Sequence, residues 1–144
     1  MCGIAGIWQL DGRPVERATV ERFIGALAHR GPDGEGVLID DQGRLALAHR
    51  RLAILDLSAA GHQPMRSPSG RYDITYNGEV YNFLELRSDL EREGFRFRSD
   101  TDTEVILAAF ERWGPCACAA TSSATTRPWH TGWITGWETG SGAR

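Results

Sequence analysis

The sequence lacks the features that mark nucleic-acid-binding, membrane-spanning and exported proteins. Its 144 residues carry a formal net charge of -3, and no run of basic residues is longer than Arg50-Arg51. The chain therefore offers no basic patch for a phosphate backbone or an anionic membrane. No apolar stretch approaches the roughly 20 residues of a membrane span, and the N-terminus has neither the basic nor the apolar segment of a signal peptide. We expect a cytoplasmic protein with no nucleic-acid or membrane partner.

Cysteine is also scarce. The chain has three, Cys2, Cys116 and Cys118, and an odd number without a secretion signal disfavours a disulfide framework. The pair Cys116-x-Cys118 has no second pair of ligands with which to complete a zinc site. We therefore predict that Cys2 is a free thiol and that the chain binds no metal.

The length of 144 residues predicts a single domain, because a chain of this size rarely forms two independent cores. Apolar periodicity predicts that this domain has mixed α and β structure. The sequence predicts strands over residues 4–10, 45–47 and 72–76, and helices around residues 20–27, 83–93 and 101–113. The third helix begins with the capping box TDTE at residues 101–104, and Gly31-Pro32 is a stop signal after the first helix. The fold class we expect is α+β.

The composition changes abruptly after residue 115. Residues 116–144 contain no Leu, Val, Phe or Tyr and are rich in Ala, Thr, Ser, Gly and Trp, so neither a helical nor a strand face can be drawn. We therefore divide the chain into a domain, 1–115, and an atypical tail, 116–144, which we expect to be disordered or to derive from a shift of reading frame.

Cys2 is the residue best suited to nucleophilic chemistry. A small second residue favours removal of Met1, which would leave Cys2 with both a thiol and a free α-amine. The amine has a pKa near 8 and can act as base for the thiol of the same residue. Two alternatives stand beside this one: Cys2 is a small core residue at the start of a strand, or it pairs with His29, His49 or His62 as in a papain-like hydrolase.

Two further features suit the binding of a charged amide substrate. Asn77-Gly78 follows a predicted strand and offers a side-chain amide beside an open backbone N–H, as an oxyanion hole requires, although Asn-Gly is also the commonest hairpin turn. Arg50 or Arg51 could bind a carboxylate and Asp102 an ammonium group, although each is also compatible with a surface charge or, for Asp102, a favourable helix start.

Five ordered segments together resemble the glutaminase domain of glutamine-hydrolysing asparagine synthetases, a class II glutamine amidotransferase. They are residues 1–7 (MCGIAGI), 29–34 (HRGPDG), 49–56 (HRRLAILD), 76–82 (YNGEVYN) and 99–106 (SDTDTEVI). The resemblance implies the N-terminal-nucleophile fold, an αββα sandwich, which we expect to be incomplete at its C-terminal side. It also implies that the chain is a truncated member of the family.

The resemblance further implies roles for individual residues. Cys2 would attack the side-chain amide of L-glutamine, and Asn77 and Gly78 would hold the oxyanion. Arg51 would bind the α-carboxylate of glutamine, and Asp102, with the backbone near Glu79, its α-amine. No cofactor would be needed for this half-reaction. ATP and Mg²⁺ would serve only a synthetase domain that amidates aspartate, and the chain has no Ser-Gly-Gly-type loop for it.

Two consequences of the resemblance concern the integrity of the chain. Residues 116–122, if encoded by GC-rich codons, can be translated in another frame into a peptide close to the family pattern, which suggests a frameshift near codon 115. The alternative to an active glutaminase is a non-catalytic remnant or a fragment that binds glutamine without hydrolysing it.

Overall fold

The chain forms two antiparallel sheets with helices on their outer sides. The computed structural model describes residues 1–53 and 58–114, together with the backbone of residues 132–136. Its elements are β1 (Gly3–Trp8), α1 (Arg17–Ala26), β2 (Gly34–Ile39), β3 (Leu45–Arg51), a 3-10 turn (Ala59–Gly61), β4 (Met65–Arg66), β5 (Tyr72–Tyr76), α2 (Phe83–Arg92), α3 (Asp102–Trp113) and β6 (Gly132–Gly136). The α+β class is confirmed.

The first sheet has the strand order β1-β3-β2, with every neighbour antiparallel. Side chains of β3 alternate between its two faces, as they must in an extended strand. Ala46 and Ala48 pack against Val20 and Ile24 of α1 in the smaller of two buried apolar clusters. The opposite face of β3 therefore carries Leu47, His49 and Arg51.

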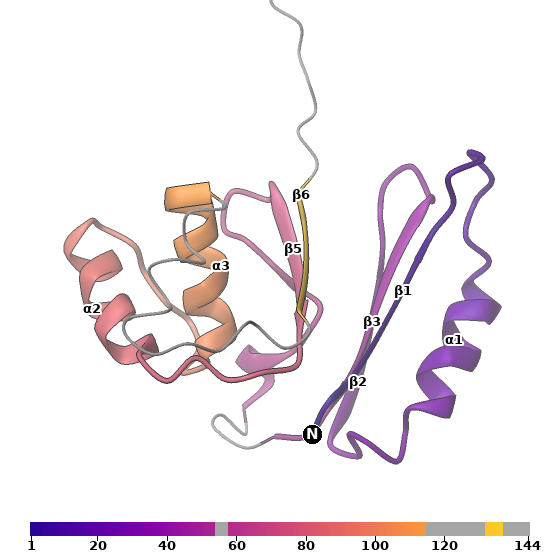
Figure 1. Cartoon of the computed structure of the whole chain (residues 1–144), viewed down its shortest axis with the longest axis horizontal. Coiled ribbons are helices and arrows are strands. Elements are labelled where there is room, and N and C mark those ends of the chain that lie inside the picture. Colours follow the sequence, from indigo (N-terminus) through magenta and orange to yellow (C-terminus); the bar gives the residue numbers. More distant parts are fainter. Residues whose placement is uncertain (54–57, 115–131, 137–144) are drawn as a thin grey trace, which may run out of the picture.

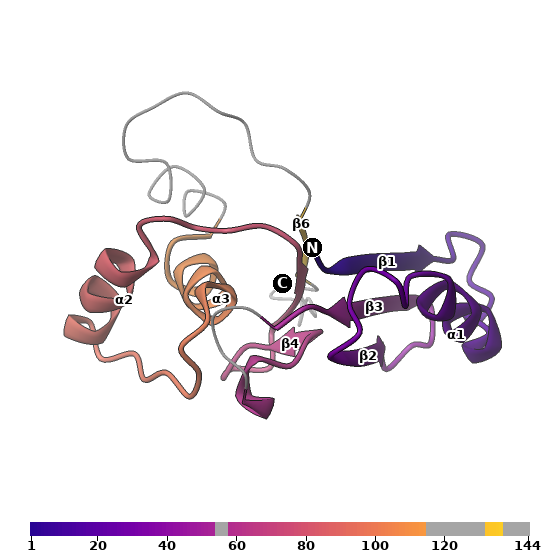
Figure 2. The ribbon, with the colours of Figure 1, turned by 90° about the horizontal axis from the view of Figure 1, so that it is seen from below.

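The second sheet has the order β4-β5-β6 and lies over the larger buried cluster. Ile74 and Tyr76 of β5 belong to this cluster, with Leu90 of α2 and Leu107 of α3. Figure 1 shows α1 outside the first sheet, and α2 and α3 outside the second. The N-terminus lies between the two sheets in both views (Figures 1 and 2).

Most of the predicted elements are present, with shifted ends. The helix predicted from residue 83 is α2, and Thr101 caps α3, because its hydroxyl accepts a hydrogen bond from the Glu104 N–H at 3.3 Å. Phe23 is 46% exposed, so the buried face of α1 is narrower than its periodicity predicts. None of the helices in the described parts of the chain is long and apolar enough to cross a membrane.

Three strands were not predicted. β2 begins with two glycines in its first three residues, and β4 has only two residues, so neither gives a clear alternating pattern. β6 lies in the segment 116–144, for which we expected no regular structure, and it pairs with β5 from Gly132↔Tyr76 to Gly136↔Tyr72. That expectation is wrong for these five residues, because antiparallel pairing uses backbone groups and needs no apolar face. The rest of the tail, including Cys116 and Cys118, lies outside the described residues.

Candidate active site

One pocket, of about 370 Å³, is lined by all six residues to which the family resemblance gave a role. These are Cys2, Arg51, Asn77, Gly78, Glu79 and Asp102. They come from the residue before β1, the end of β3, the segment after β5 and the start of α3. Residues more than 20 positions apart in the chain thus line a single concave site, which is the usual setting for small-molecule chemistry.

Cys2 lies half-buried at the start of β1 and is a free cysteine. Its Sγ accepts a hydrogen bond from the Leu52 N–H at 3.3 Å, and Sγ lies 3.6 Å from the Leu52 carbonyl oxygen. The Arg30 guanidinium donates to the Cys2 carbonyl oxygen at 3.2 Å. Cys2 belongs to neither apolar cluster, so the structure does not support its role as a small core residue. Met1, 76% exposed, also lines the pocket.

The two adjacent arginines have different environments. The Arg50 side chain turns toward α1, where its Nε donates to the Ile24 carbonyl oxygen at 3.0 Å, and it pairs with Glu35 at 2.6 Å. Arg51 lines the pocket, and its Nη1 donates to the Ser58 carbonyl oxygen at 2.7 Å. Alternation along β3 separates the two, so Arg51 is the arginine placed to meet a ligand.

Gly61 provides the space that the Arg51 side chain occupies. A Cβ added at Gly61 would lie 2.5 Å from Arg51 Nη2 and 2.9 Å from Thr101 Cγ2. The chain after β3 is held by Asp33, whose carboxylate accepts from the Ala53 N–H at 2.9 Å and whose N–H donates to the Arg51 carbonyl oxygen at 3.0 Å. The HRGPDG segment therefore supports the end of β3, beside Cys2.

Asn77-Gly78 does not form the hairpin turn that its sequence also suggested. The next element after β5 is α2 rather than a paired strand, and Gly78 is absent from the described glycines with positive φ. A Cβ added at Gly78 would lie 2.5 Å from the Tyr76 hydroxyl oxygen and 2.6 Å from its Cζ. Glycine is needed here because the Tyr76 ring packs directly against its α-carbon.

Asp102 is a buried carboxylate rather than a surface charge, with 6% of the residue exposed. Its Oδ2 accepts from the Val80 N–H at 3.0 Å, and its Oδ1 accepts from the Thr103 hydroxyl at 3.4 Å. Burial is the largest influence on the Asp102 pKa and raises it, with a smaller contribution from the charge of Glu79. A cationic group beside Asp102 would favour the charged carboxylate and offset this cost of burial.

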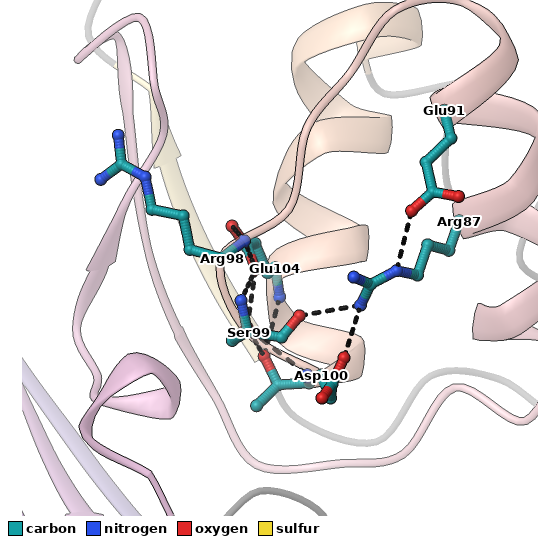
Figure 3. Close-up of polar contacts among 7 residues, drawn as sticks. Arg87, Glu91, Arg98, Ser99, Asp100 and Glu104 are labelled. Atoms are coloured by element: carbon teal, nitrogen blue, oxygen red, sulfur yellow. Dashed lines mark hydrogen bonds and ion pairs between the residues drawn. The ribbon is translucent and has the colours of Figure 1, made fainter.

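A network of polar contacts holds the loop that precedes Asp102 (Figure 3). Glu104 accepts from the backbone N–H of Arg98 at 3.0 Å and from the N–H and hydroxyl of Ser99, each at 2.7 Å. Arg87 of α2 donates to the Ser99 carbonyl oxygen at 2.8 Å and to Asp100 at 3.3 Å. The capping glutamate thus reaches further back than a simple capping box requires and fixes the start of α3.

The sequence offered His49 only as one of three possible histidine partners of Cys2, and the structure places it in the lining of the pocket. It is 1% exposed, its Nδ1 lies 3.1 Å from the Thr75 hydroxyl oxygen of β5, and its Nε2 has no hydrogen-bond partner among the described residues. Burial, followed by the charges of His62 and Arg51, lowers the His49 pKa to about 4. Its position on the same face of β3 as Arg51 is the signal that could have identified it.

The histidine alternative for Cys2 loses support from this geometry. A papain-like pair stabilises a thiolate with an imidazolium, whereas the environment of His49 disfavours the charged ring. His29 is exposed, contacts the Ala26 carbonyl oxygen at 3.0 Å and does not line the pocket. In the described ranges, no group of three or more His, Cys, Asp and Glu residues is arranged to hold a metal ion.

Comparison with known proteins shows the family of the chain. Residues 1–123 match the family described as "Glutamine amidotransferase domain". The chain belongs to this family. It is 35% identical over 116 residues to asparagine synthetase [glutamine-hydrolyzing] 1 of Bacillus subtilis (strain 168), an alignment that covers 78% of this chain and 18% of the relative.

Two other relatives carry similar names. A putative asparagine synthetase [glutamine-hydrolyzing] 2 of Methanocaldococcus jannaschii is 41% identical over 130 residues, covering 79% of this chain and 24% of the relative. Asparagine synthetase B [glutamine-hydrolyzing] of Escherichia coli (strain K12) is 35% identical over 116 residues, an alignment that covers 80% of this chain and 20% of the relative. The chain therefore spans only about a fifth of the length of these curated relatives.

Proposed function

We propose that this chain is a glutaminase domain that hydrolyses L-glutamine to glutamate and ammonia through a thioester on Cys2. The observation that carries the proposal is the single pocket in which Cys2 faces the same space as Arg51, Asn77 and Asp102. Family membership and the names of the relatives support glutamine as the substrate.

The polarity of the pocket suits both ends of glutamine. Arg51 presents a guanidinium to the α-carboxylate, since arginine binds carboxylates through two parallel hydrogen bonds. Asp102, with the backbone near Glu79, receives the α-ammonium group. These contacts orient the side-chain amide toward Cys2, while Asn77 and the Gly78 N–H receive its oxygen.

The reaction then proceeds in two steps. Once Met1 is removed, the α-amine of Cys2 takes the thiol proton, and Sγ bonds to the amide carbon to give a tetrahedral oxyanion held by Asn77 and Gly78. The C–N bond breaks, and the nitrogen leaves as ammonia with that proton. Water then attacks the thioester carbon, which releases glutamate and restores the thiol. This half-reaction requires no cofactor.

The partner in this proposal is a synthetase domain of the kind the relatives' names describe, which would receive the ammonia and amidate aspartate. ATP and Mg²⁺ would act in that domain alone. We also propose that the fold is the αββα sandwich of N-terminal nucleophile hydrolases, supported by the order of layers in Figure 1. The cytoplasmic location stays a prediction.

Covalent capture tests the proposal. Intact mass spectrometry of the full chain, before and after exposure to a diazoketone analogue of glutamine, reports Met1 removal and modification of Cys2 together. We expect loss of the methionine mass and a single adduct, with Cys2→Ala as the matched control that gains none. Loss of Met1 without an adduct would overturn the proposal and favour a non-catalytic remnant.

A glutamine-binding fragment without catalysis would give a different result. It would be protected from thermal unfolding by L-glutamine, yet it would neither gain the adduct nor release ammonia from glutamine. Measuring ammonia release beside the mass spectrum therefore separates the two functions.

A further inference from the structure

Tyr76 is a polar pocket residue that neither the sequence analysis nor the proposed reaction uses. It is the last residue of β5 and is 7% exposed, with its ring in the larger apolar cluster. It also lines the pocket, and its hydroxyl oxygen lies 2.5 Å from the point that a Cβ on Gly78 would occupy. The hydroxyl is therefore held beside the segment proposed to bind the substrate.

The Tyr76 hydroxyl makes no hydrogen bond with any residue in the described parts of the chain. Its oxygen is not one of the fully buried polar atoms without a partner, so it is open to the pocket that Tyr76 lines. A phenol oxygen in that position can accept a hydrogen bond from a bound ligand. The side chain cannot easily turn elsewhere, because its ring is packed in the core and against Gly78. A partner supplied by the ligand would satisfy this hydroxyl.

The charges around Tyr76 indicate which group of a ligand it would meet. Burial is the largest influence on the Tyr76 pKa and raises it, and the negative charges of Asp102 and Glu79 raise it further. The phenol is therefore neutral at ordinary pH and lies in a negative part of the pocket. Such a position suits a positively charged ligand group and disfavours a carboxylate.

An α-ammonium group brings three N–H donors and no acceptor, so full binding requires three acceptors. The proposed function supplies the Asp102 carboxylate and the backbone near Glu79. The Asp102 oxygens already accept hydrogen bonds from the Val80 N–H and the Thr103 hydroxyl. This set leaves room for one further acceptor, and a neutral phenol oxygen is a suitable one.

We propose that the Tyr76 hydroxyl oxygen accepts a hydrogen bond from the α-ammonium group of glutamine, so that Tyr76 selects substrates that carry an α-amine. This inference rests on the proposed function. It assigns to Tyr76 a part in substrate specificity and none in bond breaking.

The test compares two substrates on the full chain and its Tyr76→Phe variant. L-Glutamine carries the α-amine, and glutaramate, the same five-carbon amide without it, does not. We expect the wild-type preference in kcat/KM for L-glutamine over glutaramate to fall about tenfold in the variant, since a hydrogen bond to a charged group is lost. The loss should lie mainly in KM for L-glutamine, with glutaramate kinetics unchanged.

Tyr72→Phe is the matched control, because it makes the same change in the same strand at a residue that does not line the pocket. It should leave the preference unchanged. Thermal unfolding checks that each variant is folded. If Tyr76→Phe does not fold, Tyr76→His takes its place, because histidine retains a hydrogen-bond acceptor. This variant should keep part of the preference for L-glutamine. Complete loss of the preference would contradict the proposal.

Two results would overturn the inference while leaving the proposed function intact. Equal losses on both substrates would mean that Tyr76 acts only by supporting Gly78, and no change on either would mean that the hydroxyl meets no substrate group. Failure of the proposed function is a separate result, in which the wild-type chain hydrolyses neither substrate and is not captured by the diazoketone analogue.

Discussion

The two halves of the molecule contribute different parts of the site. The half built from the first sheet and α1 has five residues in its buried cluster, and it supplies Cys2 and Arg51. The half built from the second sheet, α2 and α3 has ten, and it supplies Asn77, Gly78, Glu79 and Asp102. In the proposed function, the half with the smaller core would therefore supply the nucleophile and the carboxylate-binding arginine, and the half with the larger core the oxyanion donors and the ammonium site.

The pocket therefore depends on how the halves are joined. One link is the contact between His49 Nδ1 on β3 and the Thr75 hydroxyl on β5, at 3.1 Å. Another is the close approach of β2 to the segment just before β4, where a Cβ on Gly36 would lie 2.0 Å from the Gln63 carbonyl oxygen. Substitution of a single site residue should thus affect either chemistry or binding, whereas substitutions at the links between the halves should affect both.

Cys2→Ala should produce the largest effect and leave both halves folded. Removal of the nucleophile is expected to lower glutaminase kcat by at least about 10⁴-fold, in line with other covalent hydrolases. Ammonia release from L-glutamine measures the loss, and thermal unfolding should match that of the wild-type chain. Residual activity near the wild-type level would place the nucleophile elsewhere.

Asn77→Ala tests the contribution of the larger half to the chemical step. Loss of one oxyanion donor should lower kcat by about 10²- to 10³-fold with a small change in KM, because the contact strengthens only as charge develops on the oxygen. Steady-state kinetics separates the two parameters. A change confined to KM would instead assign Asn77 to ground-state binding.

Stability between pH 4 and 7 tests the link at His49. The folded-state pKa of about 4 lies below the unfolded value of 6.5, so the unfolded chain binds more protons in this interval. The stability from this group is fully present above pH 6.5 and falls as the pH drops toward 4, by up to about 3 kcal/mol. Denaturant unfolding at several pH values measures this dependence.

His49→Gln is the variant that isolates this contribution, since glutamine retains a polar group for Thr75 and does not titrate. Its free energy of unfolding should change less between pH 4 and 7 than that of the wild-type chain. Asp102 acts in the opposite direction, because its raised pKa makes protonation favour the folded state as the pH falls. Parallel pH curves for His49→Gln and the wild-type chain would contradict the assigned environment of His49.

The site residues proposed from the sequence meet in one pocket, whereas three strands of the two sheets were not predicted. Each site residue lies within a segment whose chemistry or family resemblance was visible, and strand alternation alone separates Arg51 from Arg50, since Ala46, Ala48 and Arg50 share the face toward α1. The glycine-rich start of β2 and the two residues of β4 have no periodic pattern to detect. Their pairing depends on tertiary contacts with β3 and β5.

Tyr76, to which the sequence gave no role, and His49, which it offered only as a possible partner of Cys2, share one property. His49 and Tyr76 are buried polar side chains whose importance arises from what lies across the pocket, in another part of the sequence. Local patterns assign a histidine or tyrosine in a strand to the core, and here both do lie in the interior. Only the three-dimensional arrangement brings Tyr76 into the same pocket as Asp102 and leaves His49 Nε2 without a partner among the described residues.

Gly61→Ala should have the smallest effect, and one confined to substrate binding. The new methyl group would lie 2.5 Å from Arg51 Nη2, so the flexible guanidinium must move, while Cys2 and Asn77 stay in place. We expect KM for L-glutamine to rise by about tenfold, the cost of a weakened charge-assisted contact, with kcat nearly unchanged.

Gly25→Ala is the matched control for Gly61→Ala, because Gly25 lies in α1 and a Cβ there meets nothing within 4 Å. The control should keep the wild-type KM and gain stability of about 0.5–1 kcal/mol, as alanine does in a helix. Equal KM values for both variants would show that the Arg51 guanidinium does not meet the substrate, and the smaller half would then contribute the nucleophile alone.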